Sequence, residues 1–262
     1  MRFIYFIIFV SMLFFMGCAT IDMSMLDKAE PLKANVMTLT GYNTIGWDPW
    51  TVIRERPDSI PDIDMSTAAK KNAELKSGIQ MNIGLGKEME LGSKFFDFFA
   101  NRYVSNKTYL KIRVYHPKET VSLALEPTIG YQKAQENSKA HEIFLWDDFE
   151  HDFTFISTDT SCELPIIYTV KTLDEKSDSY SLIGRISYDY MKIRYYDGKY
   201  PSEGTYEIDK CNWRAGIYGS MDVKDALVIS FGLEVSPLFT GKTNVMPIAS
   251  IGLRYMRDNT GK

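Results

Sequence analysis

The sequence predicts an all-β protein: an up-and-down antiparallel β-barrel of about ten strands (eight to ten), preceded by an N-terminal signal helix. Three observations lead to this fold class. Apolar and polar residues alternate along most of the chain after residue 36, the alternating runs are longer than ordinary strands, and the segments between them are long and short in turn. A meander of strands that closes on itself accounts for all three.

The alternation is clearest in Leu227–Pro237. Apolar residues occupy every second position there, and the positions between them carry mostly serine, glycine and glutamate. Val121–Tyr131 and Ala249–Met256 follow the same pattern. Because successive side chains of a strand point to opposite faces, these runs predict strands with one apolar and one polar face.

Seven further segments alternate in the same way: Asn35–Asn43, Ser77–Gly86, Glu88–Phe96, Thr108–Tyr115, Cys162–Thr172, Tyr180–Tyr196 and Cys211–Met221. Most of the runs have nine to eleven residues, which is the length of a tilted strand that crosses a bilayer. Pro127, Pro165 and Pro237 fall inside runs and predict bulges or strand ends.

The connections alternate in length. The long ones are Thr44–Lys76, Asp97–Lys107, Gln132–Ser161, Asp197–Lys210 and Leu238–Met246, and the short ones are Lys87, His116–Thr120, Leu173–Ser179 and Asp222–Ala226. Barrels that span membranes have short turns at one end and longer loops at the other. An even number of strands returns both chain ends to the short-turn end.

Composition excludes two classes of protein. The chain has 262 residues and a formal charge of −4, which argues against nucleic acid as the main partner. Its one long apolar run, Phe3–Met16, has fourteen residues and excludes a bundle of membrane helices.

The N-terminus has the parts of a secretory signal. Arg2 is a short basic region, Phe3–Met16 is the apolar region, and Gly17, Cys18 and Ala19 follow. A small residue before a cysteine at this place resembles the bacterial lipobox. The resemblance implies removal of residues 1–17, acylation of Cys18, and sorting to the outer membrane, because Ala19 follows the cysteine. An ordinary signal peptide with an incidental cysteine is the alternative.

Together, these features resemble a small bacterial outer-membrane β-barrel with a lipoprotein signal. The resemblance implies a lipidated tether at residues 18–35, a transmembrane barrel at residues 36–256 and a polar tail at residues 257–262. The strand Ser250–Met256 partly resembles the final-strand signal of the barrel-assembly machinery. The implied partners are outer-membrane lipids and the barrel-assembly and lipoprotein-sorting machineries, with no nucleic acid and no cofactor.

If the apolar faces contact lipid, the polar faces line a lumen. Twelve charged residues are then expected inside, seven basic and five acidic. They are Glu90, Lys94, Lys111, Arg113, Glu126, Glu163, Lys171, Arg185, Asp189, Arg214, Glu234 and Arg254. The expected pairs on neighbouring strands join Glu90 to Lys111 and Arg113, Arg113 to Glu126, Asp189 to Arg214, Arg214 to Glu234, and Glu234 to Arg254. These pairs predict a plugged or very narrow lumen, which is either a structural ion-pair core or a narrow channel for small anions or water.

Aromatic residues stand where interface girdles are expected. Tyr131 and Trp213 face outward at the long-loop end, and Tyr180 and Tyr255 do so at the short-turn end. Strands favour aromatic residues in any case, so this observation only supports the orientation.

The cysteines and histidines each allow more than one interpretation. Cys162 and Cys211 lie about two strands apart, so a disulfide requires strand ends to bend inward, and two free cysteines are the other possibility. His116 reads as a solvated turn residue. His141 and His151 accompany Trp146 and a group of carboxylates, Asp147, Asp148, Glu150 and Asp152. That group reads as an acidic solvated loop, with weak calcium binding or acid–base catalysis as alternatives.

Three classes of function remain. The leading hypothesis is a lipid-anchored outer-membrane barrel with a structural, adhesive or limited permeation role, and not an enzyme. The second is a lipocalin-like lipoprotein that binds a small apolar ligand, with apolar faces inside and charged faces outside. The third is a hydrolase at the barrel mouth, which depends on the carboxylate group near His151.

Overall fold

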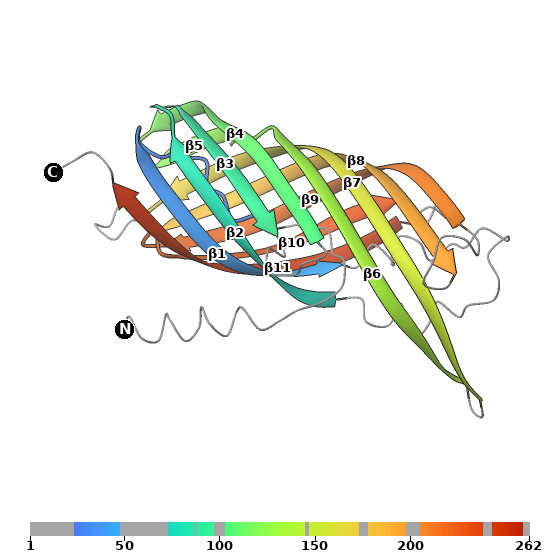
Figure 1. Cartoon of the computed structure of the whole chain (residues 1–262). Coiled ribbons are helices and arrows are strands. Elements are labelled where there is room, and N and C mark those ends of the chain that lie inside the picture. Colours follow the sequence, from blue (N-terminus) through green and yellow to red (C-terminus); the bar gives the residue numbers. More distant parts are fainter. Residues whose placement is uncertain are drawn as a thin grey trace, which may run out of the picture.

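A computed structural model describes residues 24–47, 73–86, 88–96, 103–144, 147–172, 178–197, 205–237 and 243–258. These residues form one closed antiparallel barrel (Figure 1), which confirms the predicted fold class. The predicted signal peptide and Cys18 lie outside the described residues. Within the described ranges, no helix has the length and apolarity needed to cross a bilayer.

The strands follow one another around the barrel in chain order. They are β1 (Val36–Trp47), β2 (Ala73–Gly84), β3 (Met89–Phe96), β4 (Tyr103–Lys118), β5 (Val121–Leu125), β6 (Thr128–Phe144), β7 (Asp147–Lys171), β8 (Ser179–Asp197), β9 (Thr205–Val223), β10 (Leu227–Pro237) and β11 (Thr243–Asp258). Pairing of β1 with β11 closes the ring. β5 and β6 share one position between β4 and β7, so the barrel has ten positions, as predicted.

The division between β5 and β6 is caused by Pro127. The register with β4 is the same on both sides of it, since Leu125 pairs with Ile112 and Thr128 with Tyr109. Proline has no N–H to donate, so the ladder is interrupted without a shift. Pro237 is the last residue of β10, whereas Pro165 stays inside β7.

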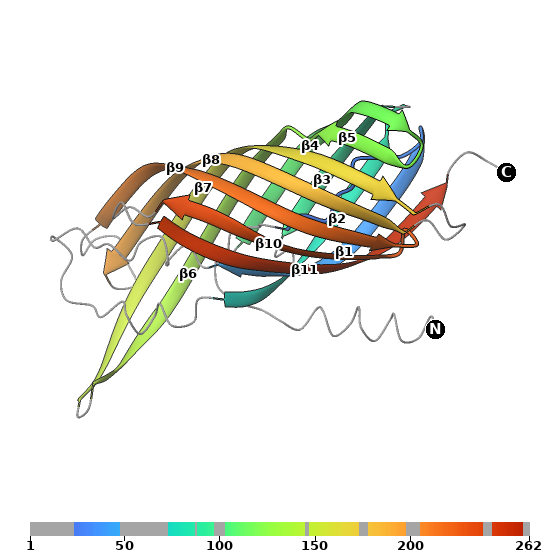
Figure 2. The ribbon, with the colours of Figure 1, turned by 180° about the vertical axis from the view of Figure 1, so that it is seen from behind.

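The segment Gln132–Ser161 is not a loop, and this prediction was wrong. β6 continues to Phe144, and β7 begins at Asp147, so the two strands form a long hairpin (Figures 1 and 2). β4 accompanies β6 only as far as Ala134, and β8 accompanies β7 only from Phe153. Where β6 and β7 pair only with each other, they have no third strand beside them and need no strict apolar face, so the sequence alternation does not reveal them.

The two faces of the barrel wall differ in the predicted sense. In β10, Phe231 and Leu233 point outward with 65% and 50% of their surface exposed, whereas Ser230 and Glu234 are buried. β7 and β8 alternate in the same way between exposed apolar and buried polar residues. The lipocalin-like alternative is therefore wrong, because it requires the apolar faces inside.

The chain ends of the barrel meet at the short-turn end. Val36, the first residue of β1, pairs with Asp258, the last residue of β11. β11 thus includes the first two residues of the predicted polar tail, because β1 offers backbone partners to that point.

Candidate functional site: a charged lumen closed by the N-terminal segment

The segment just before β1 lies inside the barrel. We call residues 24–32 the plug. Met25, Leu26 and Asp27 keep at most 2% of their surface exposed. Its hydrogen-bond partners lie on β2, β3, β7 and β11, which surround the lumen, so the segment is enclosed on several sides. The sequence predicted a tether at residues 18–35, whereas the structure places residues 24–32 of it inside the lumen.

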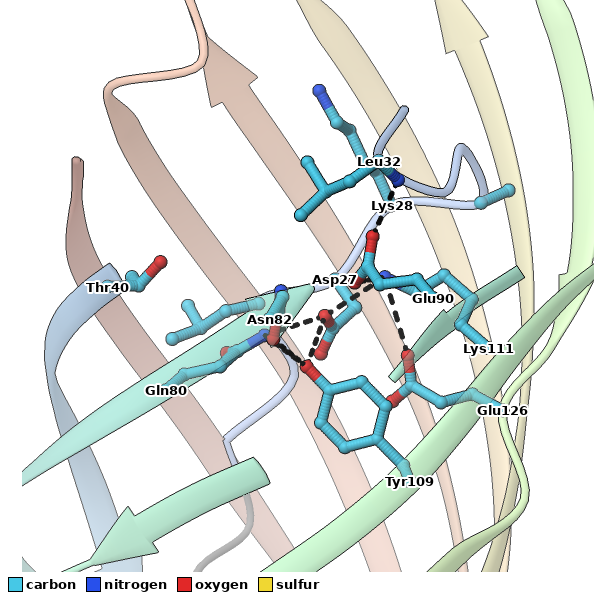
Figure 3. Close-up of polar contacts among 12 residues, drawn as sticks. Asp27, Lys28, Leu32, Thr40, Gln80, Asn82, Glu90, Tyr109, Lys111 and Glu126 are labelled. Atoms are coloured by element: carbon cyan, nitrogen blue, oxygen red, sulfur yellow. Dashed lines mark hydrogen bonds and ion pairs between the residues drawn. The ribbon is translucent and has the colours of Figure 1, made fainter. Parts of the chain in front are cut away.

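Asp27 of the plug is surrounded by polar side chains of the barrel wall (Figure 3). Gln80 Nε2 donates to its Oδ1 over 2.8 Å, and Lys111 Nζ and the Tyr109 hydroxyl each lie 3.3 Å from the same oxygen. Lys94 Nζ lies 2.9 Å from Oδ2. Gln80, Lys94 and Lys111 therefore bring donors from three strands to one carboxylate that the barrel wall does not supply. The Tyr109 hydroxyl lies beside it and donates its single proton to Asn82 Oδ1 over 2.6 Å.

The charge state of Asp27 follows from these neighbours. Burial alone raises the pKa of a carboxyl group, but the positive charges of Lys94 and Lys111 overcome this effect and lower the pKa of Asp27. The plug therefore carries an ionised carboxylate into the lumen at neutral pH.

The lysines and glutamates around Asp27 form a wider network. Lys111 Nζ lies 2.9 Å from Glu90 Oε1 and 3.6 Å from Glu126 Oε2. The second oxygen of Glu90 accepts a hydrogen bond of 2.8 Å from the backbone N–H of Leu32 (Figure 3). Wall and plug are thus joined both at Asp27 and at the last residue of the plug.

Two further charged residues of the plug also pair with the wall. Lys28 forms ion pairs with Asp222 and Asp225, and Glu30 forms one with Lys171. Burial raises the pKa of Asp225, but the charge of Lys28 outweighs this and lowers it.

The backbone and an apolar side chain of the plug are held as well. Arg254 Nη2 donates to the Leu26 carbonyl over 3.1 Å, and the Ala29 N–H donates to Thr169 Oγ1 over 2.7 Å. The Leu26 side chain packs with Tyr42 and Val228 in a small buried apolar cluster. The plug therefore has specific contacts along its length, unlike a loosely filling tail.

A second charged cluster fills the lumen beside β7 to β10. Arg214 donates to both carboxylate oxygens of Asp189, over 2.5 and 2.6 Å, and to Glu234 over 2.7 Å. Arg185 pairs with the other oxygen of Glu234, and Glu163 lies 3.5 Å from Arg185 and 3.8 Å from Arg214. Such mutual pairing offsets the high cost of burying these charges.

Three lumen tyrosines stand opposite glycines. Tyr42 is the ladder partner of Gly78, Tyr109 of Gly92, and Tyr218 of Gly232. A Cβ placed on any of these glycines would come within 2.1 to 2.3 Å of the facing ring. The missing side chain lets each ring lie flat against the wall, where the hydroxyls of Tyr109 and Tyr218 reach the charged clusters.

The structure places most of the predicted lumen residues inside. Eight of them keep at most 3% of their surface exposed: Glu90, Lys94, Lys111, Glu126, Arg185, Asp189, Arg214 and Glu234. The pairs Glu90 with Lys111, Asp189 with Arg214, and Arg214 with Glu234 all form. Glu163, Arg185 and Arg214 also come together across the lumen.

Other predicted pairs were wrong. Arg113 binds Glu88 in the β2–β3 turn over 2.6 Å, and Lys111, not Arg113, is the neighbour of Glu126. Arg113 still pairs in register with Ala124, but its backbone N–H donates to the Glu88 carbonyl over 2.9 Å, so it lies beside the β2–β3 turn. Arg254 pairs with Asp222, because Glu234 stands opposite Met246 instead.

Several lumen residues escaped the sequence analysis. Asp27 and Glu30 lay in the predicted tether, Asp159 in a predicted loop, and Asp222 in a predicted turn. Lys107, which donates to Glu163 over 2.7 Å, stood one residue before its predicted strand. The predicted wall residues carry two more positive than negative charges, and the plug, with Asp27, Lys28 and Glu30, adds a net charge of −1, so this excess was a partial signal.

The remaining sequence candidates lie away from the lumen. Cys162 and Cys211 are both exposed and free, so the disulfide left open by the sequence is not formed. His116 is exposed near the end of β4, and not in a turn as predicted, 3.4 Å from Glu88. The four residues of the expected girdles, Tyr131, Trp213, Tyr180 and Tyr255, expose 47% to 68% of their surface. Among the described residues, no group of histidine, cysteine and carboxylate side chains has the arrangement of a metal site.

His141, His151 and the nearby carboxylates fall in the β6–β7 hairpin, except for Trp146, which lies outside the described residues. Their backbone is paired, with His141 opposite Glu150 and His151 opposite Ala140. The structure does not describe their side chains, so calcium binding and hydrolase activity remain predictions from the sequence.

Comparisons with known proteins give only distant similarities. No protein-family model matches the chain, and no curated protein does. Among solved structures, the attachment invasion locus protein Ail of Yersinia pestis is 12% identical with a TM-score of 0.29, and the match covers 86% of this chain and all of that one. The CymD monoaromatic hydrocarbon channel is 7% identical with a TM-score of 0.25 (87% and 89% covered). The siderophore receptor PirA from Pseudomonas aeruginosa is 8% identical with a TM-score of 0.20 (84% and 40% covered). These scores are too low to carry a function or a location to this chain.

Proposed function

We propose that the chain spans a bacterial outer membrane as a lipid-anchored barrel whose lumen is closed at rest by its own N-terminal plug. The observation that carries the proposal is the outer surface, where large apolar side chains are exposed on strands all around the barrel. They include Leu39, Met81, Leu91, Val114, Ile129, Ile166, Leu182, Ile217, Phe231 and Ile251. An apolar surface that encircles a barrel fits hydrocarbon and not water.

The interior supports the same proposal. A barrel in water would place its arginines and glutamates outside, yet Arg185 and Glu234 expose 2% and 0% of their surface. Charges buried at such a cost are paired in the lumen, where they replace an apolar core and keep polar groups away from lipid.

The anchor is the second part of the proposal. In a lipoprotein signal, Cys18 is the acylated residue, and it stands six residues before Ser24, the first described residue of the plug. Six extended residues span about 20 Å, so an anchor at Cys18 would remain close to the barrel. The sorting and barrel-assembly machineries are the partners that this route requires.

A closed lumen is the third part. The plug and the cluster of Arg185 and Arg214 both fill the interior with paired, buried side chains. We propose limited permeation in this state, at most water and small ions, and a non-enzymatic role. Larger solutes would pass only if the plug leaves the lumen.

Fractionation of Cys18→Ala tests the membrane part. Removal of the acylated cysteine leaves the apolar wall intact, so the variant should still require detergent for extraction and should still migrate faster on gels before heating than after it. Release of Cys18→Ala into the soluble fraction without detergent would contradict a membrane-spanning barrel.

Planar-bilayer recordings test the closed lumen. Wild-type protein should show little current above background, and a variant without residues 24–32 should conduct small ions measurably better, because only the cluster of Arg185 and Arg214 then fills the lumen. Large, steady currents through the wild type would contradict the closed state. Equal insertion of both proteins, measured by heat-modifiable mobility, is the control.

The β6–β7 hairpin favours a second role, in contact with other surfaces. Beyond Ala134 and before Phe153 its two strands pair only with each other, so it extends past the neighbouring strands (Figures 1 and 2). A variant in which an Asn-Gly turn replaces residues 137–154 should keep the barrel and reduce attachment of expressing cells to each other or to a solid surface. Unchanged attachment would remove this role.

A further inference from the structure

The donors around Asp27 belong to the wall, whereas the carboxylate belongs to a separate segment. Gln80 is on β2, Lys94 on β3, and Tyr109 and Lys111 on β4. These strands are joined by continuous ladders, which fix the donors relative to one another. The plug, in contrast, reaches this place only through side-chain and backbone contacts. The wall therefore holds a preformed set of donors that a carboxylate occupies.

The wall residues that contact Asp27 are buried, so removal of its negative charge is costly. Gln80 is fully buried, and Lys111, Lys94 and Tyr109 expose 2% to 3% of their surface. Without Asp27, the ammonium group of Lys94 loses the carboxylate that lies 2.9 Å away. Lys111 retains Glu90 at 2.9 Å and Glu126 at 3.6 Å. Loss of an ion pair at a buried site is costly, so an anion that replaced Asp27 would be bound favourably.

The geometry favours a carboxylate over a larger anion. One oxygen, Oδ1, accepts from the Gln80 amide and lies 3.3 Å from the Lys111 ammonium group (Figure 3), and the other, Oδ2, lies 2.9 Å from the Lys94 ammonium group. Two oxygens thus account for the charged and amide donors of the wall. The Tyr109 hydroxyl, 3.3 Å from Oδ1, donates its proton to Asn82 Oδ1 over 2.6 Å and supplies no further donor for a third anionic oxygen.

We propose that Gln80, Lys94, Tyr109 and Lys111 form a binding site for small carboxylates, and that Asp27 occupies this site in the closed state. The inference rests on the closed lumen proposed above and extends it to a class of solute. A free carboxylate and the plug then compete for the same donors, so a carboxylate-bearing solute is the ligand that opposes closure.

Replacement of the missing carboxylate from solution tests this site. Asp27→Ala is purified in detergent at pH 7, and its thermal midpoint is measured by loss of the fast-migrating folded band. Sodium formate, sodium chloride of the same ionic strength and neutral formamide are compared. Formate should raise the midpoint of Asp27→Ala by about 3–5 °C at ten times its Kd. Formamide and chloride should have little effect on the midpoint of Asp27→Ala. None of the three additions should have much effect on the midpoint of the wild type.

Two further variants make the result specific. Asp225→Ala removes a carboxylate partner of Lys28 at the edge of the barrel, outside the four residues of the site, and should not respond selectively to formate. Asp27→Ala combined with Lys94→Met removes both charges of the closest pair and should fold without a response to formate. A selective formate response in either variant would show that the effect does not come from this site.

Equal effects of formate and chloride on Asp27→Ala would overturn the proposal. Failure of Asp27→Ala to fold in either salt would also overturn it, because formate would then not replace the side chain. The measurement is made in detergent and does not depend on anchoring or conductance. A negative result here, with a conducting plug-less variant in bilayers, would therefore reject the carboxylate site and leave the closed lumen standing.

Discussion

Tyr109 lies directly over Gly92. The two residues are ladder partners on β4 and β3, and a Cβ on Gly92 would come within 2.1 Å of the ring carbon Cζ of Tyr109. The hydroxyl of the same ring reaches Asp27 over 3.3 Å. A glycine in the wall thus sets the position of a tyrosine that holds the plug.

Gly92→Ala should lower the free energy of unfolding by about 2 kcal/mol, because the added methyl group overpacks the lumen and moves the Tyr109 ring. The comparison is Gly184→Ala, since an added Cβ at Gly184 meets no atom within 4 Å. Urea titrations of both variants, followed by heat-modifiable mobility, check the difference. Equal stability of the two variants would show that the ring does not depend on the glycine.

Arg214→Met should destabilise the barrel by about 3–5 kcal/mol, because it leaves the buried carboxylates of Asp189 and Glu234 without a main partner. Lys192→Met is the matched control. Lys192 lies 3.9 Å from Asp209 in an exposed pair, so its loss should cost less than about 1 kcal/mol. A loss below 1 kcal/mol for Arg214→Met would mean that the lumen charges are solvated and not mutually paired.

Phe231→Arg should destabilise the protein by about 2–4 kcal/mol in lipid vesicles, because Phe231 lies near the middle of β10 and points outward with 65% of its surface exposed. Leu85→Arg, at a residue of the β2–β3 turn that is 49% exposed, should have little effect. The measurement is unfolding by urea in vesicles. Comparable tolerance at both positions would argue that the outer surface contacts water.

The contact between Lys28 and Asp225 should be lost only in acid. The pKa of Asp225 is lowered in the folded state, so its contribution is fully present above the ordinary carboxyl pKa of about 3.9 and disappears as the pH falls through the folded value. Wild type should therefore exceed Asp225→Asn in thermal midpoint by a constant, small amount from pH 5 to 8. That difference should shrink below about pH 4. The effect is small because the Asp225 side chain is 35% exposed. A difference that changes between pH 6 and 8 would point to another titrating group.

The barrel wall could be predicted from sequence because its information is local. In Leu227–Pro237, the polarity of each residue indicates whether its side chain lies on the inner or the outer face of the wall. Ten such runs define both the strands and the orientation of the faces. The β6–β7 hairpin was missed for the same reason. Beyond Ala134, it no longer follows the alternation by which the wall was recognised.

The plug could not be predicted in this way. Asp27 stands in a short segment without periodicity, and its partners Gln80, Tyr109 and Lys111 are 53, 82 and 84 residues away in the chain. Only the imbalance of charge among the predicted lumen residues pointed to it. Contacts that form only in the closed barrel cannot be recognised from the pattern of neighbouring residues in the sequence.

The contact between Arg254 and the Leu26 carbonyl joins residues 228 positions apart, one just ahead of the first strand and the other on the last. Leu26 is thus synthesised long before its partner exists. That contact can form only once β11 is in place, so the full set of plug contacts is completed together with the last strand of the barrel.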